Sequence, residues 1–258
     1  MELWIFGLSF FGMLLLNVPI AICMSLSSAL YLAITGDMFM VSITAPRFFA
    51  GMNSFTMLAI PLFILSGDLL CSGKASKLLI DLANSLVGHL KAGLSTVTTL
   101  ACMFFGAVSG SGAATASAIG SVVAPESERS GYDKDFIAAI IASAGPIGIL
   151  IPPSIPMVVY GAATDTSIGA LLLSGIGPGI LFGILIILYG YWYSGKKGYG
   201  SSARFIWSNV FSSGRKAAWA LLTPLIIVGG IYSGIFTPTE AAAVAAVLGV
   251  LALLMNPR

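Results

Sequence analysis

The stretch FFGAVSGSGAATASAIGS, Phe104–Ser121, decides the fold of this chain. It holds four serines, one threonine and four glycines, although long apolar segments lie on both sides of it. Glycine loosens a helical backbone, and a hydroxyl group placed in hydrocarbon needs a hydrogen-bond partner. We therefore predict that two half-helices meet at a bend formed by Ser109–Gly112.

The composition around this stretch is that of an integral membrane protein. Of the 258 residues, 57% are hydrophobic and 9% charged, and the mean hydropathy is +0.99; soluble domains carry roughly 25% charged residues. Windows of about 20 apolar residues recur along the chain without the alternation of a membrane β-barrel. The sequence therefore predicts an all-α, multi-span membrane protein, and it has no nucleic-acid-binding signature.

The apolar segments give the expected order of elements. The first lacks the basic start and small-residue cleavage site of a signal peptide, so we interpret it as a retained transmembrane segment, broken or bent near Pro19. The residues from Lys74 to 92 place leucines opposite charges at helical spacing, which predicts an amphipathic helix at the membrane interface. The predicted apolar segments are 3–35, 52–70, 93–124, 136–160, 168–193, 218–233 and 238–255.

Loop charges predict how the segments are oriented. The linker 194–217 holds Lys196, Lys197, Arg204, Arg215 and Lys216, whereas the link 161–167 holds only Asp165. The positive-inside rule places the first in the cytoplasm and the second outside. If segment 136–160 crosses the membrane once, segment 93–124 must enter and leave the membrane on the same side. Half-helices of about 14 residues would rise roughly 21 Å, too short to span, so we predict a re-entrant hairpin.

A second break is predicted in the stretch ASAGPIGILIPPSIPMVVYG. Pro152 has no N–H group and clashes one turn back, and Pro153 disfavours helical geometry at the residue before it. Segment 136–160 should therefore be a discontinuous helix. Irregular backbone at membrane depth is tolerated only where protein buries it or where it lines a cavity.

The two breaks are candidate binding sites. Carbonyl and hydroxyl oxygens suit Na⁺, and the N-terminus of a half-helix suits a carboxylate, as in secondary transporters whose broken helices oppose each other. The candidate residues are Ser109, Gly110, Ser111, Gly112 and Thr115 in the hairpin, with Ser117 one turn on, and Gly145, Gly148, Pro152, Pro153 and Ser154 in the proline segment.

Structural roles compete with these functional ones. The G-x-x-x-G spacing of Gly106 and Gly110 also suits close helix packing. Glu240 in TPTE fits a capping box as well as a proton relay. Asp68 suits an interface position as well as a buried coupling carboxylate. The four tryptophans suit aromatic belts, and the scattered cysteines, Cys23, Cys71 and Cys102, suit packing.

An enzyme is the weaker hypothesis. The chain has one histidine, His89, in a polar segment, so an intramembrane serine hydrolase would have to bring it to Ser109 or Ser111. No metal, phosphate-loop or redox motif is present. A non-transporting membrane scaffold is the other alternative.

The run from Gly106 to Gly161, with GPIGILIPPSIPMVVYG, and the later GIFTPTEAAAVAA resemble the large membrane subunit of tripartite ATP-independent periplasmic (TRAP) transporters. The resemblance covers nearly all of the chain. It implies a Na⁺-driven, elevator-type transporter of the bacterial or archaeal cytoplasmic membrane with two inverted repeats, each with a re-entrant hairpin and a broken helix. It also implies carboxylate substrates, such as a C4-dicarboxylate or sialic acid, a periplasmic binding protein, a small membrane subunit, and no cofactor beyond the coupling Na⁺.

The resemblance also divides the chain. Residues 1–200 correspond to the first repeat, with the hairpin tip Ser109–Gly112 and the break Gly145–Ser154 forming the first Na⁺ site and one wall of the substrate cavity. Residues 201–258 correspond to a cytoplasmic link and the start of a second repeat. Proline at the head of both NVPIAICMSLSSALYLAI and FTPTEAAAVAAVLGVLAL is a faint sign of this repeat. Members of the family continue for well over a hundred further residues, so we expect the chain to be the N-terminal part of a permease.

Overall fold

The structure is a computed structural model that describes residues 2–36, 38–71, 75–199 and 205–255. Within these residues the secondary structure is entirely helical, which confirms the predicted all-α class. The chain divides into two compact units, Met1–Ser54 and Phe55–Arg258. Lys74, the start of the predicted amphipathic helix, and Arg204, one of the basic residues of the linker 194–217, lie outside the described residues.

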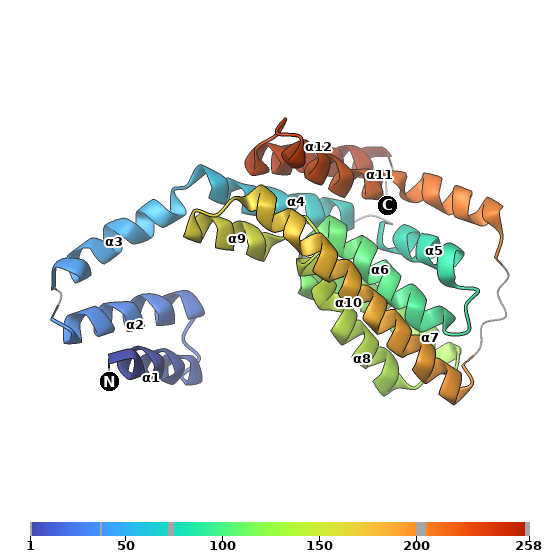
Figure 1. Ribbon diagram of the computed structural model, residues 1–258, viewed down its shortest axis with the longest axis horizontal. Coiled ribbons are helices and arrows are strands. Elements are labelled where there is room, and N and C mark those ends of the chain that lie inside the picture. The colour runs from blue at the N-terminus through green and yellow to red at the C-terminus, as the bar shows by residue number, and fades with distance from the viewer. Residues whose placement is uncertain (1, 37, 72–74, 200–204, 256–258) are drawn as a thin grey trace. The chain divides into compact units, whose positions relative to one another are not determined.

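The first unit holds α1 (Glu2–Leu15), α2 (Ile20–Ile34) and α3 (Met38–Met52). Asn17, in the left-handed region at φ 60°, and Pro19 separate α1 from α2, so the predicted break near Pro19 is confirmed. The two helices fold back and pack on each other (Figure 1). Segment 3–35 is thus two helices of 14 and 15 residues, and α3 was not among the predicted apolar segments.

The second unit contains the rest of the described chain (Figure 1). Its elements are η1 (Phe55–Leu58), α4 (Ala59–Cys71), α5 (Ala75–Val87), α6 (Gly93–Ser109), α7 (Gly112–Arg129), α8 (Lys134–Ala144), η2 (Gly145–Ile149), α9 (Ile155–Thr164), α10 (Ile168–Lys197), α11 (Trp207–Tyr232) and α12 (Pro238–Met255).

Helices α6 and α7 form the expected hairpin around Gly110. They have 17 and 18 residues, so each rises about 26 Å rather than the 21 Å expected from the sequence. The difference arises partly because α7 continues through Pro125 to Arg129. The start of α6 and the end of α7 line one cavity, which contains Leu94 and Glu126. The hairpin therefore leaves and returns at the same end of the unit.

Two single helices among the described residues, α10 and α11, are long and apolar enough to cross a bilayer. On α10 the buried face is lined by small residues at helical spacing, including Gly175, Gly179, Gly183 and Gly190. On its other face Leu181, Leu185 and Leu188 are 53–59% exposed. Small residues against protein and leucines outward are typical of a membrane helix.

Helix α5 is amphipathic as predicted. Leu79, Leu82 and Ala83 are buried in the core that α6 and α8 also build, while Lys77 and Asp81 are exposed. This helix packs against α6 and α11. Its placement at the membrane interface stays a prediction.

The charged loops gather at the end of the unit where the hairpin opens. The Lys197 ammonium at the end of α10 lies 3.0 Å from the Asp133 carboxylate, and the Asp133 N–H donates to the Tyr199 hydroxyl at 3.1 Å. The Lys197 ammonium and the Tyr199 hydroxyl hold the pKa of Asp133 below its ordinary value. The linker 194–217, which the charge rule assigned to the cytoplasm, thus meets the loop before α8 at this end.

The structural readings of Glu240 and the cysteines are confirmed. The Glu240 carboxylate accepts from the Thr237 N–H at 2.8 Å, and the Glu240 N–H donates to the Thr237 hydroxyl at 3.3 Å, which is a capping box. Cys23 and Cys102 are fully buried. The side chain of Cys71 lies outside what the structure describes. Trp4, Trp192, Trp207 and Trp219 are 38–76% exposed, as belt residues would be.

Candidate functional site

The hairpin tip is built from short-range hydrogen bonds. Gly110 ends α6 in the left-handed region at φ 63°, and its N–H donates to the Gly106 carbonyl. Ser111 begins α7 in extended geometry, and its hydroxyl accepts from the Ala114 N–H at 3.3 Å. The chain therefore reverses over two residues, because glycine adopts positive φ without strain and serine is a good N-cap.

Three oxygen atoms converge behind this turn. The Ser109 and Thr115 hydroxyl oxygens are 3.1 Å apart, and the Thr115 hydroxyl donates to the Ser111 carbonyl at 2.8 Å. Ser109 is 5% exposed and Thr115 is fully buried. Each hydroxyl oxygen has two lone pairs, so the group retains acceptor capacity for a small cation.

The proline segment is non-helical between η2 and α9, as the sequence predicted. The Pro152–Pro153 peptide bond is cis. Ser154 begins α9, and its hydroxyl donates to the Ile149 carbonyl at 2.7 Å and accepts from the Met157 N–H at 3.4 Å. Pro152 cannot donate to the Gly148 carbonyl one turn back, which leaves that oxygen without its helical partner.

The hairpin tip and the proline segment fit against each other through glycine. A methyl group added to Gly110 would lie 2.7 Å from the Pro153 carbonyl oxygen, and one added to Gly148 would lie 2.6 Å from the Thr115 hydroxyl. A methyl group on Gly112 would lie 3.3 Å from the Gly145 carbonyl oxygen. The structure thus brings the two sets of candidate residues together, and the packing role of the glycines holds alongside any binding role.

A cavity of about 520 Å³ opens beside the tip, between α4, the hairpin and the start of α9. On the α4 side, a methyl group on Gly67 would lie 3.3 Å from the Ser109 backbone. The polar side chains and the glycine that line the cavity are Gly67, Asp68, Ser109, Ser111, Ser117 and Ser121. Pro152, Pro153 and Ser154 are buried beside the tip and do not line this cavity.

Asp68 lies at a place that the sequence did not predict. Its side chain is exposed to the cavity that also contains Ser109 and Ser111. The sequence favoured an interface because Asp68 is near the end of an apolar segment. The only sequence feature that could have predicted its place in the cavity was the glycine before it. Gly67 is small, which allows α4 to approach the tip and brings the neighbouring Asp68 carboxylate to the cavity.

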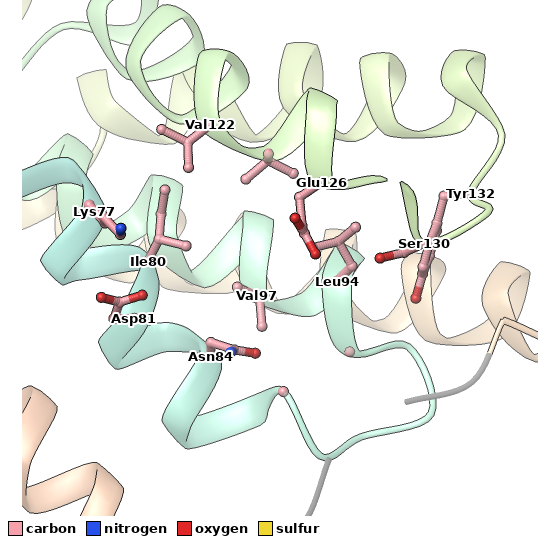
Figure 2. A pocket seen from close by; sticks show the side chains of 13 residues that line it. Lys77, Ile80, Asp81, Asn84, Leu94, Val97, Val122, Glu126, Ser130 and Tyr132 are labelled. Atoms are coloured by element: carbon pink, nitrogen blue, oxygen red, sulfur yellow. The ribbon is translucent and has the colours of Figure 1, made fainter. Parts of the chain in front are cut away.

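A second cavity, of about 450 Å³, lies at the open end of the hairpin. Figure 2 shows Lys77, Asp81 and Asn84 from α5 around it, with Glu126 from α7. Glu126 lies fifteen positions after Ser111, about 22 Å along α7. This cavity of mixed charge is therefore separate from the tip.

The serine hydrolase geometry is not present. The His89 ring packs edge-on against Phe205 with ring centroids 5.0 Å apart, and His89 lines a cavity with Asn209 and Lys216. The Ser109 hydroxyl instead contacts Thr115. Among the described residues no group of acidic, histidine and cysteine side chains could hold a resident metal ion.

Comparison with known families agrees with this geometry. The profile of the family described as the tripartite ATP-independent periplasmic transporter, DctM component, matches residues 8–256. This chain belongs to the DctM family. The tip, the proline segment and the cavity all lie inside the matched region of this DctM-family chain, and the resemblance stated from the motifs is confirmed.

Individual DctM-type relatives are named as transporter permeases rather than enzymes. The C4-dicarboxylate TRAP transporter large permease protein DctM of Vibrio cholerae is 45% identical over 236 residues, which are 92% of this chain and 52% of that protein. The isethionate TRAP transporter permease protein DctMQ of Oleidesulfovibrio alaskensis is 44% identical over 92% of this chain and 38% of its own length. The ectoine large permease TeaC of Halomonas elongata is 38% identical, over 93% and 56%.

The chain spans about half the length of the relatives that it matches. Family membership and the apolar helices α10 and α11 indicate a multi-pass membrane protein.

Proposed function

We propose that this chain provides the first-repeat half of a Na⁺-coupled TRAP permease that imports acidic substrates across the cytoplasmic membrane. The observation that carries this proposal is the fit of the hairpin tip against the proline segment, which gathers hydroxyl and carbonyl oxygens where two helices are interrupted. In secondary transporters, broken helices of this kind coordinate the coupling ion and the substrate near the membrane midplane.

Na⁺ enters the proposal as a transported ion. Its ligands would come from the Ser109 and Thr115 hydroxyls and the Ser111 carbonyl, whose oxygens lie within 3.1 Å of their neighbours, and from the carbonyl of Gly148, a residue that packs closely against Thr115. The other candidates, Gly110, Gly112, Gly145, Pro152, Pro153 and Ser154, hold these groups in place.

The substrate class follows from the relatives and from the helix termini. The named substrates of the three relatives, a C4-dicarboxylate, isethionate and ectoine, each carry an acidic group. The N-terminus of α7 at Ser111 faces the 520 Å³ cavity, and its free N–H groups favour an anion. A carboxylate substrate such as a C4-dicarboxylate or a sialic-acid-like sugar acid fits this arrangement.

The architecture and partners complete the proposal. Residues 1–200 would form the first of two inverted, elevator-type repeats and residues 201–258 the link to the second. In the described structure α11 and α12 pack against α5 and α4, so both parts contribute to one compact unit. A small membrane subunit and a periplasmic binding protein would complete the complex in the lipid bilayer.

The test is uptake of a labelled carboxylate into proteoliposomes that contain the completed permease, the small subunit and the binding protein. We expect uptake to require an inward Na⁺ gradient, and Ser109→Ala to raise the half-saturating Na⁺ concentration by about tenfold, because it removes a ligand worth roughly 1–2 kcal/mol.

Ser127→Ala is the matched control for Ser109→Ala. Its hydroxyl is also buried on the hairpin, but it donates to the Ala124 carbonyl at 2.7 Å, far from the tip. Equal uptake with and without the Na⁺ gradient would refute coupling. Equal Na⁺ dependence of the two variants would refute the site.

A further inference from the structure

A third cavity lies between α5 and the start of α11, two helices that pack against each other (Figure 1). Its volume is about 360 Å³, within the range of roughly 300–1,000 Å³ that is typical of small-molecule sites. Ile206 is the one apolar residue among the described residues that line it. The α11 side chains in the cavity follow the spacing of one helix face; they are Asn209, Ser212, Ser213 and Lys216.

Two opposite charges line this cavity without pairing. Asp81 comes from α5 and Lys216 from α11, and the ion pairs of the described residues join other side chains. A carboxylate and an ammonium group that share a cavity but stay apart leave room for a ligand that carries both charges. A zwitterion would find a partner at each end, whereas Asp81 would repel a simple anion and Lys216 a simple cation.

His89 adds a polar group that lacks a partner. Its ring lines the cavity, and its Nδ1 atom is buried without a hydrogen-bond partner among the described residues. A buried polar atom is costly when it makes no hydrogen bond. A small rotation of the ring would bring this nitrogen to a polar group of a ligand. The Ser212 and Ser213 hydroxyls, which line the same cavity, are further donors.

The length of α11 places the cavity at the level of lipid headgroups. With 26 residues the helix is about 39 Å long, whereas the hydrocarbon core of a bilayer is roughly 30 Å thick. Its charged residues, Arg215 and Lys216, are in its first ten positions, so this end projects from the hydrocarbon. Trp207 and Phe211 in the same turns are 76% and 79% exposed, which is typical of side chains at the membrane interface.

We propose that this cavity binds the headgroup of a phosphatidylethanolamine-type lipid. Lys216 and the Ser212 and Ser213 hydroxyls hold the phosphate. Asp81 holds the ammonium group, and the acyl chains continue into the hydrocarbon beside Trp207. The inference goes beyond the proposed function and does not depend on Na⁺ coupling, because it uses α5 and α11 rather than the hairpin tip.

The first experiment is native mass spectrometry of the completed permease in detergent with equal amounts of phosphatidylethanolamine, phosphatidylglycerol and phosphatidylcholine. We expect the first lipid to be retained about tenfold more than the others, because it alone has an ammonium N–H that can donate to Asp81. Asp81→Asn should abolish this preference. Lys216→Gln should weaken retention of all three lipids several-fold, because they share the phosphate.

Two variants match these charge changes outside the cavity. Asp165→Asn alters an exposed turn at the end of α9 whose left-handed geometry asparagine also adopts. Lys134→Gln removes an ammonium group whose side chain is 75% exposed. Both should retain the three lipids as the unaltered permease does.

The second experiment uses the unaltered permease, so it does not depend on a variant that folds. A phosphatidylethanolamine with a photoreactive group in its headgroup is crosslinked to the protein, and peptide mass spectrometry locates the label. We expect label on residues 81–89 and 206–216, displaced by unlabelled phosphatidylethanolamine but not by phosphatidylcholine. Label elsewhere, or label that both lipids displace equally, would contradict the proposed site.

Two further results would overturn the inference. One is equal retention of the three lipids by the unaltered permease, or a preference that Asp81→Asn leaves unchanged. The other concerns the source of the phosphate group. If inorganic phosphate protects the permease against heating as well as phosphatidylethanolamine does, and Lys216→Gln removes this protection, the cavity is a site for a free anion and the lipid assignment fails.

Discussion

Replacing Gly110 with alanine tests whether the tip is held by its backbone angle alone or also by the proline segment. Gly110 is at φ 63°, where a residue with a side chain is strained by about 1–2 kcal/mol. The added methyl group would also lie 2.7 Å from the Pro153 carbonyl oxygen. Overpacking of this kind costs about 1–3 kcal/mol, so we expect a total destabilisation of about 2–5 kcal/mol.

Gly131 provides the matched control. It is at φ 75°, and a methyl group added there would meet no atom within 4 Å, so Gly131→Ala should cost only the backbone term of about 1–2 kcal/mol. The difference between the two variants isolates the clash with Pro153, which we expect to be about 1–3 kcal/mol. This corresponds to roughly a five- to 150-fold change in the ratio of folded to unfolded protein.

The measurement is denaturant or thermal unfolding of the completed permease in detergent, with the two variants side by side. We also expect Gly110→Ala, but not Gly131→Ala, to weaken Na⁺-dependent uptake, because the tip would move away from the proline segment. Equal destabilisation by the two substitutions would refute the argument, since it would mean that the close approach of Pro153 does not constrain the tip.

Two further comparisons use the same assays. A methyl group on Gly175 would meet the rigid backbone carbonyl of Leu150, whereas one on Gly183 would meet the flexible end of Met103. Gly175→Ala should therefore destabilise the folded protein by about 1–3 kcal/mol, and Gly183→Ala by less. The reverse order would contradict the packing described for α10. Asp133→Asn removes a carboxylate whose folded pKa is lowered. The stabilisation that the Asp133 carboxylate gives the folded state is present above the ordinary carboxylate pKa and is lost as pH falls through the lowered value. The difference in unfolding temperature between Asp133→Asn and the unaltered protein should therefore shrink at low pH. A difference that grows as pH falls would contradict the ion pair.

The sequence predicted the helix breaks well because their causes are local. Pro152 and Pro153 cannot continue a helix whatever surrounds them, and the break is found at that point. Gly110 and Ser111 likewise determine the turn between α6 and α7 through their own backbone preferences. The capping box at Thr237 was predictable for the same reason, since its partners are three residues apart.

The placement of Asp68 could not be predicted, because it depends on contact between elements far apart in the chain. Only the close approach of α4 to the hairpin, permitted by Gly67, puts its carboxylate in the same cavity as Ser109. The helix α3, which includes Pro46 and Arg47, was missed because its sequence is less uniformly apolar. In both cases the deciding information is absent from the local pattern.

The tip between α6 and α7 also has a consequence for the order of events during synthesis. Each hydrogen bond described there joins residues at most six positions apart, while the described contacts with the proline segment are made through glycines. The turn can therefore satisfy its polar groups as soon as α7 has begun, before residues 145–154 leave the ribosome. The nascent hairpin can enter the lipid with its turn already formed, and residues 145–154 can then pack against a tip that is already folded.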